Sequence, residues 1–297
     1  MKHKLIAIVG TTASGKSTLG IELAKHYGGE VISADSRQIY RYLNLGTGKV
    51  TEEEMAEVKH HLIDVKELNE PFSMGEFQPM AYAAIDGVIA RGKMPLLVGG
   101  TGLYTRSVVE GYNLVDVPPN EPLRRELEGR GAEELRQILS SLGVSGVSPE
   151  ASERRMIRMI EKCKAGYPAE NESNPRYDVL QLGITFPREV LYKRIEERLD
   201  ARIKAGMVEE VDEVMRLGAT PEFLEKLGLE YRATYRYLTG KYSSFKEYRD
   251  DLLLQICHFA KRQGTWFKKE KNVIWLDVEG DIFSEAKMLI DKFINEV

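Results

Sequence analysis

The sequence is poor in cysteine and has no long hydrophobic run. Its 297 residues include two cysteines, Cys163 and Cys257, and neither belongs to a Cys-x-x-Cys or Cys/His cluster. This excludes a disulfide framework and a zinc site of ordinary spacing, and it is typical of a reducing compartment. No apolar stretch approaches the roughly 20 residues that a membrane-spanning helix needs. We therefore expect a cytoplasmic protein without a membrane partner.

An excess of positive charge is also absent. Lys and Arg number 42 against 46 Asp and Glu, which gives a net charge of −4. Indiscriminate coating of nucleic acid needs a basic surface, so this balance argues against it but leaves room for a local basic patch. With 42% hydrophobic residues, the chain has the composition of a globular protein of one large or two smaller domains.

The most informative segment that is present is a glycine-rich loop. It consists of Gly10, Thr11, Thr12, Ala13, Ser14, Gly15, Lys16 and Ser17. The loop follows the apolar run Leu5–Val9 and precedes the helix-like segment Thr18–Lys25, which is the strand–loop–helix setting of a phosphate-binding loop. Its amides are expected to surround an anion, Lys16 to add a positive charge and Ser17 to offer a hydroxyl to Mg²⁺. The alternative is a glycine-rich turn that binds nothing.

Apolar runs and helical periodicity together predict an α/β fold. Strands are predicted at Leu5–Val9, Glu30–Ala34, His60–Val65, Met94–Val98, Tyr177–Phe186 and Asn272–Asp277, and helices at Phe72–Arg91, Ser244–Phe267 and Ser284–Glu296. We expect a P-loop NTPase-like core with a mostly parallel sheet flanked by helices. Residues 118–175 are charged, helical in pattern and without strand signals. They are predicted to form a helical insertion domain between the core segments 1–117 and 176–297.

Two polar residues follow predicted strands at the edge where the glycine-rich loop lies. Asp35 comes directly after Glu30–Ala34, and Thr101 lies in the turn Gly99–Gly102 after the fourth strand. In an open parallel sheet, residues beyond the carboxyl ends of the strands face the ligand crevice. Asp35 is therefore a candidate catalytic carboxylate, with a helix N-cap as the alternative role. Thr101 offers a hydroxyl to a ligand, or belongs simply to a tight turn.

Two basic segments are candidates for binding phosphate groups. Arg194, Arg198 and Arg202 recur every fourth residue on one face of a predicted helix, so either one of them reaches the loop or all three are solvated. The segment Ala260–Lys269 places Arg262 near aromatic residues, which suits RNA. Cationic side chains near a helix C-terminus also complement the helix dipole without any ligand.

A carboxylate typical of nucleotide-hydrolysing P-loop proteins is missing. Such proteins usually place an aspartate at a strand end to help to hold Mg²⁺, whereas the strand Leu96–Val98 ends in glycines. Asp64 and Asp277 follow apolar residues, but neither position is convincing for a metal ligand. The loop is therefore interpreted as holding a diphosphate that leaves, not a γ-phosphoryl group that is transferred.

Several segments together resemble the bacterial tRNA dimethylallyltransferases. Besides the glycine-rich loop they are Asp35–Arg41, His60–Asp64, Val98–Tyr104, Leu191–Ile195 with Arg198–Asp200, and Ala260–Phe267, in the family's order across nearly the whole chain. The resemblance implies transfer of a dimethylallyl group from dimethylallyl diphosphate to N6 of adenosine 37, next to the tRNA anticodon, with Mg²⁺ as cofactor. We expect the enzyme to be a monomer.

The resemblance also implies roles for individual residues. Asp35 accepts the proton of the attacking amine, Thr101 helps to place the adenosine, and Gln38 reads the edge of the base. Lys16 and Arg198 hold the diphosphate together with the loop amides. Contacts to tRNA are expected from Asp35, Ser36, Arg37, Gln38, Thr101, Arg124, Arg158 and Arg262.

Other functions use the same residues. A nucleotide or small-molecule kinase would employ Asp35 as the base for a hydroxyl, but the missing strand-end carboxylate and the large insertion count against it. An adenylate isopentenyltransferase would prenylate a free nucleotide and would need no insertion that binds RNA. A non-catalytic RNA-binding module would leave Asp35 without a role.

Substitution of Asp35 tests the implied chemistry directly. Asp35→Asn keeps the size of the side chain but removes its basicity, so we expect transfer of labelled dimethylallyl groups to tRNA to be abolished while tRNA binding is retained. Turnover and filter binding measure the two effects. Near wild-type turnover of the variant would refute the general-base role.

Overall fold

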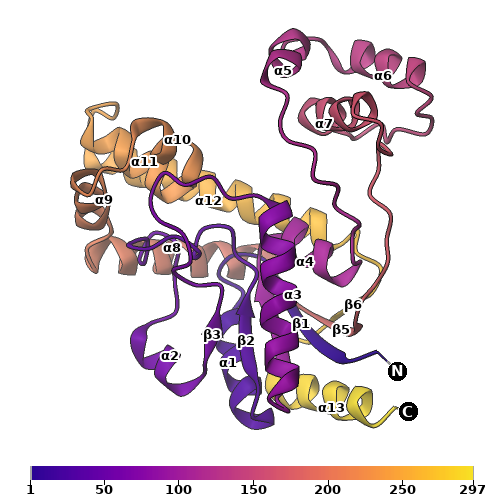
Figure 1. The fold of residues 1–297 in the computed structure, drawn as a ribbon. Helices are drawn as coiled ribbons and strands as arrows, with labels where there is room; N and C mark the ends of the chain where they lie inside the picture. Colours follow the sequence, from indigo (N-terminus) through magenta and orange to yellow (C-terminus); the bar gives the residue numbers. More distant parts are fainter. Residues whose placement is uncertain (1, 297) are drawn as a thin grey trace. The chain divides into compact units, whose positions relative to one another are not determined.

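The structure is a computed structural model that describes residues 2–296 (Figure 1). Its strands are β1 (Lys4–Gly10), β2 (Glu30–Ser33), β3 (His60–His61), β4 (Pro95–Gly99), β5 (Asp178–Ile184) and β6 (Val273–Trp275). Its helices are α1 (Lys16–Tyr27), α2 (Glu52–Glu57), α3 (Met74–Ala90), α4 (Gly102–Val109), α5 (Glu121–Leu127), α6 (Ala132–Ser141), α7 (Glu153–Lys164), α8 (Arg188–Lys204), α9 (Met207–Arg216), α10 (Pro221–Leu227), α11 (Leu229–Leu238), α12 (Phe245–Phe267) and α13 (Ile282–Asn295).

The side chains of β1 alternate between two hydrophobic layers. Ile6 and Ile8 pack with α1 and α13, whereas Leu5 and Ala7 pack with α3 and α4. Successive residues of a strand point to opposite faces, so a strand that is apolar at every position needs helices on both sides. The predicted α/β fold with a sheet flanked by helices is therefore confirmed.

All strand pairs in the described sheet are parallel, and the order is β3-β2-β4-β1-β5-β6. This order places the carboxyl ends of β2, β4 and β1 next to one another. The glycine-rich loop follows β1, Asp35 follows β2, and Gly100 and Thr101 follow β4. The topology thus brings together segments that are far apart in the sequence.

The predicted third strand, His60–Val65, is too long. Only His60 and His61 pair with β2, because Leu62 and Asp64 have φ values of 62° and 55° and leave the extended conformation. His61 binds the buried Glu30 carboxylate at 2.6 Å and His60 contacts the Val58 carbonyl at 2.7 Å. Both histidines therefore have structural partners.

The helices α8 to α12 form two hydrophobic clusters beside the sheet. One cluster joins Ala13 of the glycine-rich loop to Leu191, Ile195 and Leu199 of α8 and to buried residues of α12. The other joins Ile39, Tyr40 and Leu43 to α9, α10 and α11. This packing fixes the loops that lie beyond β1 and β2, and sequence patterns did not predict α9 to α11.

Residues Glu110–Pro175 form a second compact unit, which begins earlier than the predicted residue 118. Residues 110–113 and 172–174, here called the neck, pair with each other through Asn113 N–H to Glu172 O at 2.9 Å and Asn174 N–H to Gly111 O at 3.1 Å. A Cβ at Gly111 would lie 2.0 Å from the Asn174 carbonyl, and φ is +59° there, so the neck requires glycine. The unit contains α5, α6 and α7 around one apolar core.

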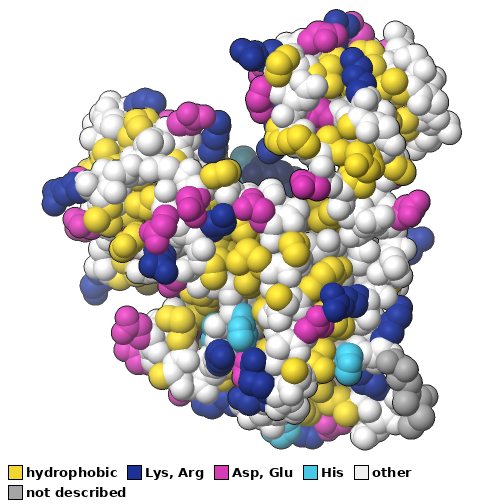
Figure 2. Space-filling model, viewed as in Figure 1, with side chains coloured by type: hydrophobic (Ala, Val, Ile, Leu, Met, Phe, Trp, Pro, Cys, Tyr) yellow, Lys and Arg dark blue, Asp and Glu magenta, His cyan; other side chains and the backbone are white. Residues whose placement is uncertain are grey.

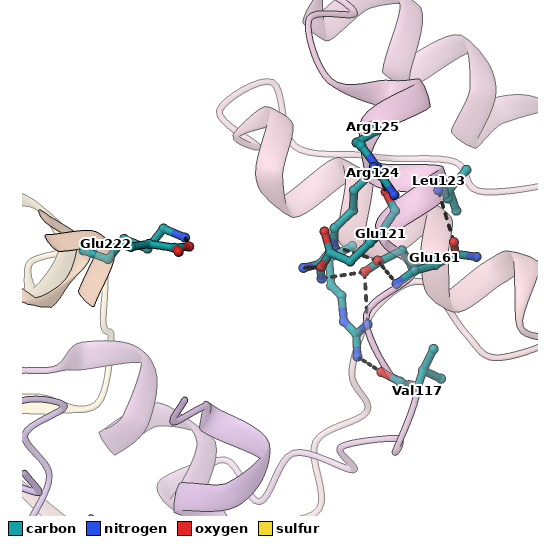
Figure 3. A network of polar contacts seen from close by, with 10 residues as sticks. Val117, Glu121, Leu123, Arg124, Arg125, Glu161 and Glu222 are labelled. Atoms are coloured by element: carbon teal, nitrogen blue, oxygen red, sulfur yellow. Dashed lines mark hydrogen bonds and ion pairs between the residues drawn. The ribbon is translucent and has the colours of Figure 1, made fainter. Parts of the chain in front are cut away.

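A buried carboxylate organises the polar part of the helical unit (Figure 3). The side chain of Glu161 is fully buried and accepts hydrogen bonds from Arg124 at 2.8 and 3.0 Å, from Arg158 at 3.1 Å and from the Asn120 amide at 2.8 Å. Burial alone raises the pKa of Glu161, but these donors outweigh it and leave the pKa below its ordinary value. Arg158 also donates to the Val117 carbonyl at 2.8 Å.

We expect Glu161→Ala to destabilise the helical unit by about 2 kcal/mol, since hydrogen bonds to a charged group are lost while the arginines remain about one third exposed. Hydrogen exchange in α7, followed in urea, measures the change. The folded pKa is lowered, so the contribution is complete at neutral pH and is lost as pH falls through that pKa. Glu121→Ala, which removes an exposed partner of Arg124, is the matched control. Equal effects of the two variants would contradict the assignment.

Candidate active site

The phosphate-binding loop has the predicted strand–loop–helix geometry. A Cβ at Gly10 would lie 2.5 Å from the Ile184 carbonyl, and Gly15 has φ +86°, so both positions require glycine. The loop closes through Ser14 N–H to Thr11 O at 3.3 Å, and Lys16 Nζ donates to the same carbonyl at 3.1 Å. The buried hydroxyls of Thr11 and Ser14 have no hydrogen-bond partner among the described residues.

A cavity of about 630 Å³ lies beyond the carboxyl ends of β1, β2 and β4. Its wall includes Lys16, Ser17, Asp35, Thr101, Arg198 and Arg262. Ser36, Arg37 and Gln38 line it as well, so the structure brings together most of the residues singled out in the core. Arg124 and Arg158 do not line this cavity, and their guanidinium groups bind Glu161 within the helical unit.

The arginine stripe of α8 reaches the loop, as one of the two sequence interpretations expects. Arg198 donates to the Thr12 hydroxyl, and Arg194 donates to the Ala13 carbonyl at 2.9 Å. Arg202 lies 3.9 Å from Glu230 and close to Gly48, where an added Cβ would strike its guanidinium group. One end of the cavity therefore carries a concentration of positive charge.

This charge is visible in the pKa values of the cations. Burial and, secondarily, the neighbouring Arg198 lower the pKa of Lys16 to about 8. Burial followed by repulsion from Arg202 lowers the pKa of Arg198 to about 10. Asp35 and, for Arg198, Glu230 offset only part of these shifts, so an anionic ligand would supply further counter-charge.

The other end of the cavity carries the acceptor groups. Asp35 Oδ1 accepts hydrogen bonds from the amides of Arg37 at 2.8 Å and Gln38 at 3.4 Å, whereas its Oδ2 has none from described residues. Thr101 Oγ1 accepts from the Ser36 amide at 3.2 Å. The segment after Asp35 is a turn and not a helix, so the carboxylate stabilises a turn with one oxygen and keeps the other available.

Gln38 is held at both ends of its amide. It accepts from Ser33 Oγ at 3.1 Å and donates to the Gly48 carbonyl at 3.0 Å. These contacts tie the turn after β2 to residues 43–49, of which Gly46, Thr47 and Gly48 line the cavity. These contacts use one lone pair of Oε1 and one N–H of Nε2, so a second lone pair and a second N–H remain for a ligand.

Sequence reasoning missed the anchor of residues 43–49. Glu210 of α9 accepts from the amides of Asn44, Leu45 and Gly46 at 2.7 to 3.1 Å and from the Tyr231 hydroxyl at 2.6 Å. A Glu in a charged helix gives no signal of such a role. The contact is visible only in the structure, where a Cβ at Gly46 would lie 2.6 Å from the Tyr231 ring.

Gln263 was missed as well. The sequence directs attention to Arg262 in the same segment, but Gln263 bonds the phosphate-binding loop directly, accepting from the Thr12 amide at 2.8 Å. Arg262 is exposed and its guanidinium group lies 5.9 Å from the centre of the Phe259 ring. The signal was present, since helical periodicity puts Gln263 one turn from the buried Ala260 and Phe267.

The two aspartates rejected as strand-end metal ligands have other partners. Asp64 binds Lys49 Nζ at 2.5 Å, and Asp277 accepts from the Glu279 amide at 2.9 Å. Within residues 2–296, no three His, Cys, Asp or Glu side chains are grouped as metal ligands. None of the helices described for these residues is long and apolar enough to span a membrane. On the face shown in Figure 2, basic and acidic side chains are interspersed.

Comparisons with known proteins point in one direction. The family described as IPP transferase matches residues 38–270. The chain is 44% identical to tRNA dimethylallyltransferase 2 of Treponema denticola over 280 residues, which cover 91% of this chain and 94% of that protein. It is 40% identical to the tRNA dimethylallyltransferase of Streptococcus agalactiae over 298 residues, which cover 99% of each.

Solved structures agree with these relatives. The full-length tRNA isopentenylpyrophosphate transferase of Bacillus halodurans superimposes with a TM-score of 0.74 at 38% identity, covering 99% of this chain and 96% of that one. A eukaryotic dimethylallyltransferase, captured crystallographically acting on tRNA, gives a TM-score of 0.82 at 25% identity, covering 98% of this chain and 79% of that one.

The lowered pKa of Lys16 predicts a pH-dependent affinity for anions. As pH rises through about 8, the free side chain loses its charge, so affinity for a diphosphate monoester should fall by up to tenfold per pH unit. The ligand's own charge is constant there, because a phosphate ester loses its last proton near pH 6. Calorimetry from pH 7 to 9.5 measures the trend. In Lys16→Arg the affinity should stay flat; a flat wild-type profile would disprove the prediction.

Proposed function

The chain belongs to the IPP transferase family, and we propose that it transfers a dimethylallyl group from dimethylallyl diphosphate to N6 of the tRNA adenosine at position 37, releasing diphosphate. The observation that carries this proposal is the division of one cavity into a cationic end and an acceptor end. Lys16 and Arg198 line the first, and Asp35 and Thr101 line the second. Donor and acceptor chemistry thus share one space.

At the cationic end the chain's own groups stabilise the leaving diphosphate. The loop amides and Lys16 surround the anion, and Arg198 sits on the Thr12 hydroxyl at the edge of the loop. Negative charge on the leaving oxygens grows as the C1–O bond breaks, so preorganised cations act most strongly in the transition state. The unpartnered hydroxyls of Thr11 and Ser14 add potential donors in the same loop.

At the acceptor end Asp35 acts as the general base. The adenine N6 amine is a weak nucleophile because its lone pair is delocalised into the ring. As N6 forms its bond to C1 of the dimethylallyl group, the free Oδ2 of Asp35 takes the N6 proton, and the electrons of the broken C1–O bond leave with the diphosphate. Oδ1 is held by two amides, so the carboxylate keeps its orientation during this transfer.

The residues present fit a magnesium ion. Ser17 follows the loop lysine, is partly exposed and lines the cavity. Its hydroxyl oxygen and the oxygens of a diphosphate are hard ligands of the kind that Mg²⁺ prefers. When bound, the ion would neutralise charge on the diphosphate.

The target base must leave the anticodon-loop stack to reach a carboxylate inside a cavity. We propose that Ser36, Arg37, Gln38, Thr101 and Arg262 contact the tRNA.

The sequence also predicts tRNA contacts for Arg124 and Arg158, but their guanidinium groups form ion pairs with Glu161. The exposed Arg125, Arg154 and Lys164 of the helical unit, which have no carboxylate partner among the described residues, are better suited to RNA phosphates. We further propose that the protein is a cytoplasmic monomer.

A transfer assay with three acceptors tests the proposal. The protein is incubated with labelled dimethylallyl diphosphate, Mg²⁺ and either unmodified tRNA, AMP or ATP, and the products are separated by size. We expect label in tRNA alone, and none when adenosine 37 is replaced by guanosine, which lacks the N6 amine. Label only in AMP or ATP would transfer the function to an adenylate isopentenyltransferase. ATP-dependent phosphorylation without prenyl transfer would establish the kinase alternative.

A further inference from the structure

Gln263 occupies a fixed position between two loops of the cavity. It lies on α12, whose residues Ala260 and Phe267 are buried on either side of it, the latter against Val9 of β1. The side chain is half-buried and belongs to the cavity wall. Because buried residues fix the helix before and after Gln263, the position of its amide relative to the sheet is fixed as well.

Both ends of this amide are used. Oε1 accepts from the Thr12 amide of the phosphate-binding loop at 2.8 Å, and Nε2 donates to the Gly100 carbonyl at 3.0 Å. The two contacts require an acceptor and a donor on one short planar group. Among side chains of this length, glutamate offers no donor, and leucine offers neither group.

The bridged loops carry the two halves of the proposed reaction. The loop after β1 holds the diphosphate, whereas the loop after β4 leads into Thr101 and its contact with Ser36, next to Asp35. Gly100, Gln263 and Lys16 pack closely, since a Cβ at Gly100 would lie 3.0 Å from Gln263 Nε2 and 3.3 Å from Lys16 Nζ. A shift of either loop therefore changes the distance between donor and acceptor.

We infer that Gln263 is a positioning residue that sets the separation between the diphosphate-binding loop and the acceptor loop. This inference rests on the proposed prenyl transfer. Alignment of two bound reactants contributes to the rate of their reaction and not to the binding of either one, and a misplacement of about 1 Å can cost roughly a hundredfold. Loss of the bridge should accordingly lower kcat and leave both KM values almost unchanged.

The test compares three variants of the full chain in the tRNA transfer assay. Gln263→Leu removes both hydrogen bonds at similar size, and Gln263→Glu keeps the acceptor for Thr12 but loses the donor for Gly100. The control Gln255→Leu removes an amide on the same helix that bonds Asp251 and Arg232. Single-turnover rates at saturating substrate, KM for each substrate and Tm are measured for all three.

We expect kcat of Gln263→Leu and Gln263→Glu to fall 10- to 100-fold, with KM for tRNA within threefold of wild type. For Gln263→Leu, KM for the diphosphate should also stay within threefold. Gln255→Leu should lower Tm as much or more but keep kcat within twofold.

The inference is overturned if either Gln263 variant keeps kcat within threefold, or if Gln263→Leu raises KM for the diphosphate at unchanged kcat. Should Gln263→Leu fail to fold, the near-isosteric Gln263→Glu decides by the same criterion. A wild-type protein that transfers nothing to tRNA would refute the proposed function instead.

Discussion

The site depends on the parallel alignment of three neighbouring strand ends. β2, β4 and β1 lie side by side, and neighbouring strands are roughly 5 Å apart. Asp35, Thr101 and Lys16, which follow these strands, therefore lie close enough to line one cavity. The alignment tolerates no side chain at its tightest points: a Cβ at Gly99 would lie 2.2 Å from the Ala34 carbonyl, and one at Gly10 would meet the end of β5. Glycine is thus a packing requirement of this edge of the sheet.

The arginines of the cavity and those of the helical unit differ in how fully their charge is compensated. Arg124 and Arg158 share the carboxylate of Glu161, which makes them part of the fold of the helical unit. Arg198 donates to the Thr12 hydroxyl, and burial followed by repulsion from Arg202 lowers its pKa although Glu230 and Asp35 oppose the shift. Cations whose charge is only partly compensated favour the binding of an anion. The two groups look alike in the sequence, since the arginines of both lie in charged helical segments.

Local patterns predicted the parts of the fold that are governed by local physics. The apolar runs that became β1, β2, β4 and β5 and the starts of α3 and α12 were located to within a few residues. The end of β3 was not, because it depends on positive φ values in a segment whose composition resembles a strand. The family, the fold class and the cluster of Lys16, Asp35, Thr101 and Arg198 around one cavity were anticipated from motifs.

What the sequence could not supply were contacts between residues distant along the chain. Gln263 and the phosphate-binding loop are about 250 positions apart, and Glu210 and residues 44–46 about 165. No spacing rule connects such pairs, and each partner is an ordinary polar residue on a helix. The same holds for Arg124, whose internal partner Glu161 lies on a different helix of the unit. Motifs identified candidate ligand-binding residues, whereas the residues that hold them in position are visible only in the three-dimensional structure.

The neck of the helical unit has a consequence for how this chain can change over evolutionary time. Residues 110–113 and 172–174 hydrogen-bond to each other, so the two chain ends that connect the unit to the core leave it close together. The hydrogen bonds of the neck offset part of the entropy lost when the two ends of the unit are held together. Each doubling of the length of a loop inside the unit adds only about 0.6 kcal/mol to that cost. Insertions and deletions within α5 to α7 therefore leave the pairing of β1 with β5 undisturbed. The helical unit can therefore diverge in sequence and length while the carboxyl edge of the sheet stays unchanged.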